Sequence, residues 1–258
     1  MRVTVLVENS SIREDLLCEH GLSLYLETGD KKILFDTGAS GAFACNADKL
    51  GIDLKQVDFA ILSHGHYDHS GGLARFLEIN ADAPVYLSPH AFGPHYNAAK
   101  KFIGMDPALA ESPRLIVTGA ETGIAPGIVL HPGFSPRYPV ETWGLCRKDA
   151  GQFLPEDFRH EQYLLVEEGE KRICVSGCSH KGILNIMDWF RPDVLIGGFH
   201  FVKLDPDSPA LTQAAKELAG YSTTYYTGHC TGGEQFTRLK AIVGDALAPL
   251  STGMTFTI

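Results

Sequence analysis

The stretch that decides the fold reads LSHGHYDHSGGL and covers residues 62–73. It follows an apolar run and carries four potential metal ligands within six residues, namely His64, His66, Asp68 and His69. Two imidazoles at positions i and i+2 can converge on one cation, and the adjacent pair of Asp68 and His69 can hold a second. A single histidine near an apolar run is more often a buried structural residue. Four ligands followed by a Gly-Gly turn instead predict a dinuclear metal centre.

The composition is that of one globular domain. With 258 residues and 44% apolar content, the chain can bury a full core, and no segment has the composition of a linker. The sequence therefore predicts a single domain over residues 1–258. Within it, residues 81–155 are rich in Pro and Gly, with strand-like runs only at 85–87 and 115–117. Such a stretch is typical of a lid or binding loop, so we expect a lid-like insertion that sets substrate selectivity.

Charge and hydropathy restrict the partners. The formal charge of −9 disfavours nucleic acid, since binding to phosphates needs concentrated Lys and Arg. No apolar run approaches the roughly 20 residues that span a bilayer, and the first residues, MRVTVLVEN, predict a strand rather than a secretory signal. We therefore expect a cytoplasmic protein with a small-molecule substrate, without nucleic acid or membrane as partner. The sequence does not determine the oligomeric state.

The cysteines do not form a recognisable framework. There are six of them and no C-x-x-C pair, which argues against both disulfides and a structural zinc finger. Reduced thiols are the expectation. Cys178 and Cys230 differ from the others because each neighbours a histidine in a Gly-rich turn.

Regular elements are predicted on both sides of the middle segment. Strand-like runs separated by turns over the first third predict a sheet of consecutive hairpins. In the last third, Ser208 caps a helix with Pro209 in its first turn. The predicted strands are 3–7, 22–27, 32–35, 57–62, 162–167, 172–176, 193–196 and 223–227, and the predicted helices are 43–50, 72–77, 183–190, 209–219 and 234–247.

Three of these strands or hairpins end in a histidine flanked by glycine. The histidines are His180, His200 and His229. Glycine permits a sharp turn and the close approach of a ligand, so this repeated pattern predicts three side chains presented at one edge of a sheet.

Residues 64–69 match the H-x-H-x-D-H signature of the metallo-β-lactamase superfamily, which the chain resembles over nearly its whole length. Within that superfamily it is similar to the subgroup named after dihydropteroate-synthase-related or methanopterin-precursor synthases. The segments that carry this similarity are EHGLSLYLE (19–27), ILFDTGASG (33–41), GCSHKGI (177–183), GGFH (197–200) and TGHCTG (227–232).

The resemblance implies a fold and a ligand set. The implied fold is an α/β, four-layer αββα sandwich with the metals at one edge of its two sheets. Many relatives carry a bridging aspartate at a strand end where this chain has Cys178, so either a thiolate replaces the carboxylate or the bridge is lost. Cys178 is then a ligand or a buried thiol. The implied ligands are His64, His66 and His180 for one metal, and Asp68, His69 and His229 for the other.

Two divalent cations are the expected cofactors. Nitrogen and oxygen ligands suit Zn²⁺, and Mn²⁺ and Fe²⁺ are alternatives because imidazole and carboxylate accept all three ions. A hydroxide held between metals about 3.5–4 Å apart is a nucleophile at neutral pH, and either cation polarises a carbonyl or phosphoryl oxygen. Asp68 would both bind metal and orient the hydroxide.

Other polar residues have roles that the sequence leaves open. Asp36 is either a hydrogen-bond acceptor for a ligating histidine or the metal loop, or part of an Asx turn. His200 is a candidate for proton transfer or substrate contact, and His20 is a weaker one. His131 and His160 show no recognisable pattern. Four further residues either meet an anionic group or are ordinary surface residues: His90, His95, Arg137 and Lys181.

Three functions remain open. The leading hypothesis is a metal-dependent hydrolase of a small ester, lactone or phosphoester. The alternative is a transferase like the subgroup's namesake synthase, which joins a pterin diphosphate to an aminobenzene ribosyl phosphate, so that an amine rather than water attacks. The substrate would then be anionic and pterin-like. A third possibility is a non-catalytic metal-binding or redox module, and the lack of a flavodoxin-like partner domain argues against it.

Overall fold

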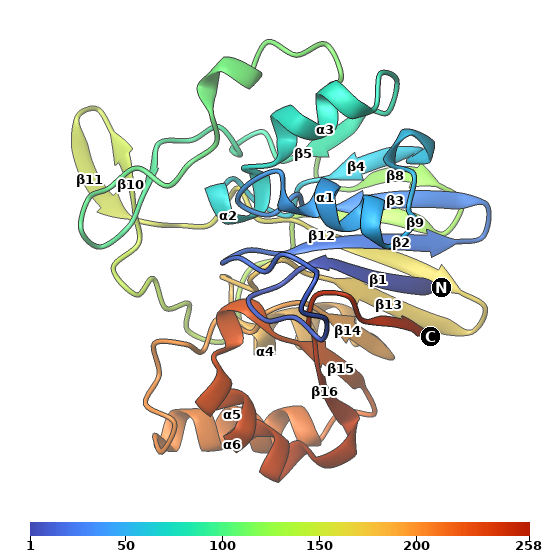
Figure 1. Cartoon of the computed structure of the whole chain (residues 1–258). Coiled ribbons are helices and arrows are strands. Elements are labelled where there is room, and N and C mark those ends of the chain that lie inside the picture. The colour runs from blue at the N-terminus through green and yellow to red at the C-terminus, as the bar shows by residue number, and fades with distance from the viewer. The chain divides into compact units, whose positions relative to one another are not determined.

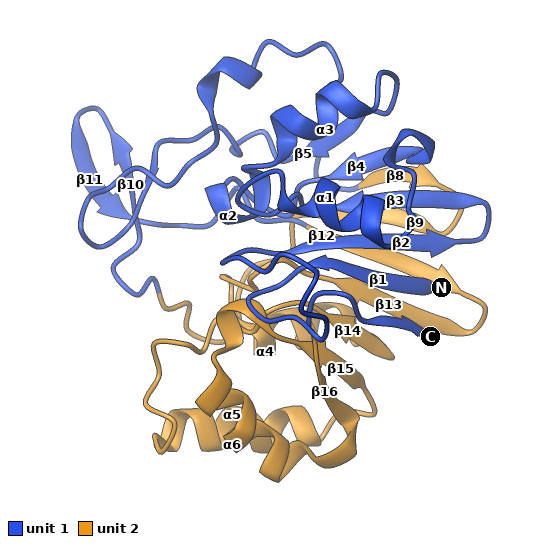
Figure 2. Ribbon diagram, viewed as in Figure 1, with its two compact units in different colours: residues 1–121, 142–162, 251–258 blue, residues 122–141, 163–250 orange.

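The computed structural model describes residues 1–258, which divide into two compact units. Unit 1 comprises residues 1–121, 142–162 and 251–258, and unit 2 comprises residues 122–141 and 163–250 (Figure 2). Each unit is built on one seven-stranded sheet and has helices of its own (Figure 1). The predicted α/β class is therefore confirmed.

The sheet of unit 1 is antiparallel at one side and parallel at the other. The first three strands along the chain pair as consecutive antiparallel hairpins, as predicted, and the strands that follow pair in parallel. The two strands predicted in the middle segment, β5 and β7, are confirmed. Across the sheet the order is β17 (Thr255–Thr257), β1 (Arg2–Val7), β2 (Ser23–Thr28), β3 (Lys31–Phe35), β4 (Phe59–Ile61), β5 (Val85–Leu87) and β7 (Leu115–Val117).

Two helices cover one face of this sheet (Figure 1). They are α1 (Ala42–Lys49) and α3 (Leu73–Ile79), which lie within two residues of their predicted bounds. Each contributes a fully buried aromatic ring, Phe43 and Phe76, to a core shared with the strands. Burying a side chain of this kind stabilises the fold by about 1.5–3 kcal/mol. A short turn of 3-10 helix, η1 (Leu54–Gln56), packs at the edge of the same core.

The middle segment also builds a separate three-stranded sheet in unit 1. Its order is β11 (Gln152–Pro155), β10 (Cys146–Asp149) and β6 (His95–Tyr96), and a turn of 3-10 helix, η2 (Pro107–Leu109), lies in the same segment. The hairpin of β10 and β11 projects from the unit (Figure 1). The sequence pattern does not reveal these strands, because they are short and polar and lack an alternating apolar face. The role of the segment as a lid stays a prediction.

The sheet of unit 2 has the same division into antiparallel and parallel strands. The hairpin predicted at 162–176 is present as β12 and β13, and β8 and β9 extend the antiparallel half. The parallel half begins where β13 pairs with β14. The order is β16 (Leu247–Pro249), β15 (Thr224–Thr227), β14 (Val194–Ile196), β13 (Lys171–Val175), β12 (Tyr163–Glu168), β9 (Ile128–His131) and β8 (Thr122–Ala125).

Three helices pack on the unit 2 sheet: α4 (Ile183–Phe190), α5 (Pro209–Ala219) and α6 (Gly233–Val243). The predicted bounds of α4 and α5 are confirmed, and the Ser208 side chain accepts a hydrogen bond from the Leu211 amide as the expected cap. None of the helices combines the length and the apolar character that a membrane span requires.

The predicted end of the last helix is wrong. Helix α6 stops at Val243 rather than at Leu247, because Gly244 adopts a left-handed φ of +70° that a continuing helix cannot accommodate. The chain then makes a 3-10 turn, η4 (Gly244–Ala246), and enters β16. A strand therefore occupies residues that the sequence pattern assigned to helix.

Candidate metal centre

The signature residues lie on the loop and short helix that follow β4. His64 and His66 stand on the loop, and helix α2 (Tyr67–Ser70) then carries Asp68 and His69 in its only turn. All four side chains are buried. His64, Asp68 and His69 each offer a ligand atom within 4.8 Å of the others, and the His66 ring centroid lies 4.7 Å from that of His64. Unit 1 thus assembles the whole signature at the carboxyl end of one strand.

A single buried carboxylate, Asp36, organises this loop. It lies at the end of β3 in a left-handed conformation (φ +57°). Its Oδ1 accepts the Ser63 amide at 2.7 Å, and its Oδ2 accepts the Ser63 hydroxyl at 2.7 Å and Nδ1–H of His69 at 2.6 Å. The interpretation of Asp36 as an acceptor for a histidine and the loop is confirmed.

These bonds determine which nitrogen each histidine presents. The Ser63 hydroxyl has a single hydrogen, and it donates that hydrogen to Asp36. The hydroxyl oxygen also lies 2.8 Å from Nδ1 of His64, so in this second hydrogen bond Nδ1–H of His64 is the donor. His69 also donates through Nδ1, directly to Asp36. In both neutral rings the lone pair is therefore on Nε2, the nitrogen through which each would bind a metal.

The electrostatics of the loop favour positive charge. Burial by itself lowers the pKa of His69, but the charge and hydrogen bond of Asp36, with the charges of Asp68 and Glu161, outweigh burial and raise the pKa above its ordinary value. An environment that stabilises a protonated ring stabilises a bound cation for the same reason. His20, which is exposed, adds a contact of 3.3 Å between its Nε2 and Oδ2 of Asp68. The donor set and its charge therefore fit a divalent metal.

The loop also leaves no room for a side chain at Gly65. A Cβ there would overlap the carbonyl oxygen of Ala91, which is backbone and cannot swing aside. We expect Gly65→Ala to lower the free energy of unfolding by about 2–4 kcal/mol, since the loop must shift to relieve the overlap. Urea denaturation of the metal-free protein measures this. Gly233→Ala is the control, because a Cβ there meets nothing within 4 Å; a similar loss in both variants would contradict the steric account.

Unit 2 brings together the other predicted ligands at the ends of its parallel strands. Cys178 and His180 follow β13, His200 follows β14, and His229 begins a 3-10 turn, η3 (His229–Thr231), after β15. The Cys178 sulfur lies within 4.8 Å of a ring nitrogen of His180 and of one of His229. The ring centroids of His180 and His200 are 4.3 Å apart. The prediction that these histidines gather at one sheet edge is confirmed within unit 2.

The turns that carry these residues are strained. Ser179, His200 and His229 have φ values of +59°, +54° and +47°, a left-handed region that residues other than glycine enter at a cost of about 1–3 kcal/mol. The Thr231 hydroxyl, bonded to that of Thr227 at 2.6 Å, accepts the Phe199 amide at 2.9 Å and ties two of these turns together. Such strain persists where the surrounding structure holds side chains for a function.

The two cysteines of these turns have different surroundings. Both are buried, and neither forms a disulfide. Cys230 donates to the Cys178 carbonyl oxygen at 3.4 Å, while the Cys178 sulfur faces His180 and His229. Whether Cys178 acts as a ligand stays a prediction.

The structure adds three residues that the sequence pattern does not connect to the site. His160, Glu156 and His95 are buried in unit 1, and ring nitrogens of His95 and His160 lie within 4.8 Å of one of His66. The alternative that His95 is an ordinary surface residue is therefore wrong. The only signal in the sequence is the adjacent pair His160 and Glu161 directly before an apolar strand.

The other three residues considered for anion binding have local partners or are exposed. Arg137 pairs with Asp188 at 3.3 Å on the surface, and Lys181 donates to the Pro132 carbonyl at 2.7 Å. His90 is exposed, and its carbonyl oxygen faces Nε2 of His95 at 3.2 Å. A role of their side chains in anion binding stays a prediction.

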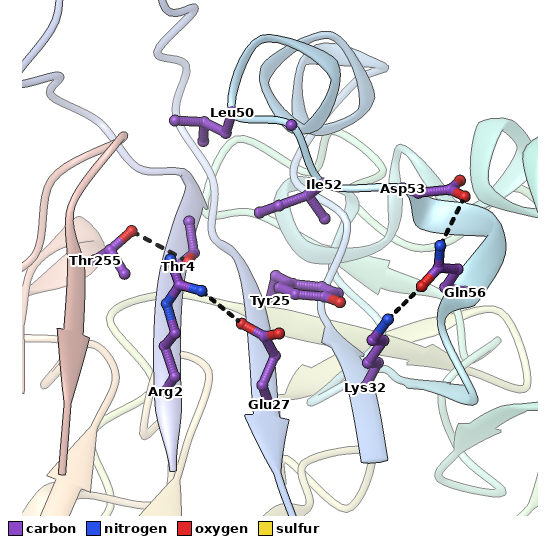
Figure 3. A pocket seen from close by; sticks show the side chains of 11 residues that line it. Arg2, Thr4, Tyr25, Glu27, Lys32, Leu50, Ile52, Asp53, Gln56 and Thr255 are labelled. Carbon is purple, nitrogen blue, oxygen red and sulfur yellow. Dashed lines mark hydrogen bonds and ion pairs between the residues drawn. The ribbon is translucent and has the colours of Figure 1, made fainter. Parts of the chain in front are cut away.

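A cavity of about 390 Å³ lies at the other end of the unit 1 sheet, where β1 and β3 begin (Figure 3). The signature follows the carboxyl end of β4, so this cavity is separate from it. Its charged groups pair with neighbours, Arg2 with Glu27 at 3.4 Å and Lys32 with Gln56. Burial, with the nearby charge of Glu27, raises the pKa of Tyr25 to about 12. The cavity offers none of the metal-ligating histidines and is not the candidate centre.

An α/β fold with histidine and carboxylate donors gathered at the carboxyl end of a strand is typical of a metal-binding protein. The model of the metallo-beta-lactamase superfamily matches residues 17–229, and the chain belongs to that superfamily. The predicted family and fold class are thereby confirmed.

Solved structures agree with this membership. Tm1679, described as a metal-dependent hydrolase of the beta-lactamase superfamily, is 29% identical with a TM-score of 0.85, over 100% of this chain and 99% of that one. Zn²⁺-bound PqqB from Methylobacterium extorquens has a TM-score of 0.60 at 12% identity over 100% of both chains, which shows the shared fold.

Curated relatives support the resemblance to the methanopterin-precursor subgroup. The 7,8-dihydropterin-6-methyl-4-(beta-D-ribofuranosyl)-aminobenzene-5'-phosphate synthase of Methanocaldococcus jannaschii is 29% identical over 240 residues, 83% of this chain and 81% of that protein. An uncharacterized protein of the same organism is 27% identical over 252 residues, 93% of this chain and 94% of that protein.

Proposed function

We propose that the chain is a metal-dependent hydrolase of a small ester, lactone or phosphoester. The observation that carries the proposal is the buried Asp36 carboxylate, which binds Nδ1 of His69 directly and Nδ1 of His64 through the Ser63 hydroxyl. Each of these histidines also offers a ligand atom within 4.8 Å of one of Asp68. The similarity of the whole chain to Tm1679, described as a metal-dependent hydrolase, supports the same reaction class.

The proposal assigns two cations, most simply Zn²⁺, with Mn²⁺ and Fe²⁺ as alternatives. Once bound, the cations would make water nucleophilic at neutral pH and polarise the oxygen of the scissile bond. The proposed sets are His64, His66 and His180 for one ion, and Asp68, His69 and His229 for the other, with Cys178 as the bridging candidate.

The protein side chains would then handle orientation and protons. Asp68 orients the attacking water and accepts its proton as the new bond to carbon or phosphorus forms. As the bond to the leaving oxygen breaks, His200 donates a proton to that oxygen, since its ring lies beside His180. His20, exposed and in contact with Asp68, is placed to meet the substrate.

A transferase is the second candidate. The identity of 29% with the synthase over most of both chains favours it. The substrate would then be an anionic, pterin-like diphosphate, and an arylamine would attack in place of water.

We expect the protein, purified without chelators, to hold about two transition-metal ions and to hydrolyse a lactone, an ester or a phosphodiester without any amine. Elemental analysis and product analysis on a panel of these substrates measure both. Protein stripped with a chelator and reloaded with zinc is the control, which should lose and regain turnover. A chain without bound metal would contradict the metal centre. Release of diphosphate from a pterin diphosphate only when an arylamine is present would establish the transferase instead.

A further inference from the structure

A buried hydrogen-bonded pair, His95 and Glu156, lies beside the metal loop and outside the signature. Nδ1 of His95 lies 2.8 Å from Oε2 of Glu156, and Nε2 of His95 lies 3.2 Å from the His90 carbonyl oxygen. Each ring nitrogen of His95 therefore has an oxygen atom within hydrogen-bond distance. His95 begins β6 and Glu156 follows β11, so the pair joins two segments of the three-stranded sheet.

His160 lies between this pair and the loop. Its ring stacks on that of His95 with centroids 3.8 Å apart and planes inclined by 27°. Its Nδ1 accepts the amide hydrogen of Gly65 at 3.0 Å. Gly65 separates the two ligand histidines His64 and His66, so the bond is made to the loop itself.

The spacing of the rings alone suggests a third metal site. Nitrogens of His66, His95 and His160 lie within 4.8 Å of one another. The hydrogen bonds argue against it, because both nitrogens of His95 already lie against protein oxygens and the Nδ1 lone pair of His160 accepts the Gly65 amide. A neutral His160 then has its hydrogen on Nε2, which leaves no free lone pair. These rings support the loop instead of holding an ion.

We propose that His160, backed by the pair of His95 and Glu156, is a positioning residue for the metal loop. The inference rests on the proposed function for the metal centre. The backbone amides on either side of His64 both donate to buried side chains. The Ser63 amide donates to Asp36, and the Gly65 amide donates to His160. The His64 imidazole is thereby fixed before a cation arrives, which lowers the cost of ordering the ligands on binding.

The first test measures zinc affinity of the stripped protein by competition with a chromophoric chelator. We expect His160→Leu, which keeps volume but removes the acceptor, to weaken zinc binding by about 10–100-fold. His160→Asn, whose side-chain oxygen can take the place of Nδ1, should bind zinc within about 3-fold of the wild type. His131→Leu is the matched control, because the buried His131 accepts the Gly133 amide at 2.9 Å in unit 2. It should lose stability without losing zinc affinity.

The second test needs no variant to fold. NMR of the stripped wild-type protein should show a scalar coupling across the hydrogen bond between the Gly65 amide nitrogen and Nδ1 of His160. Absence of the coupling, or equal zinc affinity of His160→Leu and the wild type, would overturn the positioning role. A wild-type protein that shows the coupling but binds no zinc would instead overturn the proposed function, and the positioning role with it.

Discussion

Replacing Asp68 by alanine is expected to abolish turnover while the fold is retained. The side chain is proposed both to bind a cation and to accept the proton of the attacking water, and loss of the second role alone costs about 10²–10⁴-fold. The fold should survive because the bond that Asp68 makes to Leu22 uses its backbone carbonyl oxygen, which alanine keeps. We expect His66→Ala to show a similar loss through weaker metal binding. Steady-state kinetics with metal analysis and a thermal unfolding curve measure these outcomes.

The matched control is Glu78→Ala. Glu78 lies on α3, and its exposed carboxylate pairs with Arg75 at 2.9 Å. A surface pair of this kind contributes about 0–1 kcal/mol, so turnover and metal content should stay at wild-type levels. Full activity of Asp68→Ala with two bound ions would contradict the assigned role. Loss of activity together with loss of the folded state would show instead that Asp68 supports the loop.

Asp36→Asn is expected to have a large effect on both stability and zinc affinity. The carboxylate receives three hydrogen bonds in a fully buried position, and an amide presents hydrogen-bond donors where acceptors are required. We expect the free energy of unfolding of the metal-free protein to fall by about 2–4 kcal/mol. Zinc affinity should fall by about 10–100-fold, because the nitrogens that His64 and His69 present are no longer determined. Urea denaturation and zinc competition measure the two effects.

Two further variants show which bond matters. Ser63→Ala removes only the hydroxyl between Asp36 and His64, so we expect a smaller loss of about 1–2 kcal/mol. Asp188→Asn breaks the surface pair with Arg137 and should change stability by less than about 0.5 kcal/mol. If Asp36→Asn behaved like Asp188→Asn, the buried carboxylate would not organise the loop.

Much of this protein is encoded in short stretches of sequence. The spacing of His64, His66, Asp68 and His69 predicts the metal loop, and the Ser208 cap with Pro209 predicts where α5 begins. Patterns of this kind succeed because the interactions behind them join residues only a few positions apart. The family follows from the same local signature.

Other features exist only in the folded chain. The end of α6 depends on the conformation of Gly244, and the short polar strands β6, β10 and β11 form only because they pair with one another. His160 acquires its place beside the loop through Gly65, which is 95 residues away. The sequence by itself determined the family and the candidate ligands of the signature, because neighbouring residues encode them. Tertiary structure decided which buried groups hold those ligands, because burial and hydrogen-bond partners arise from residues that meet only on folding.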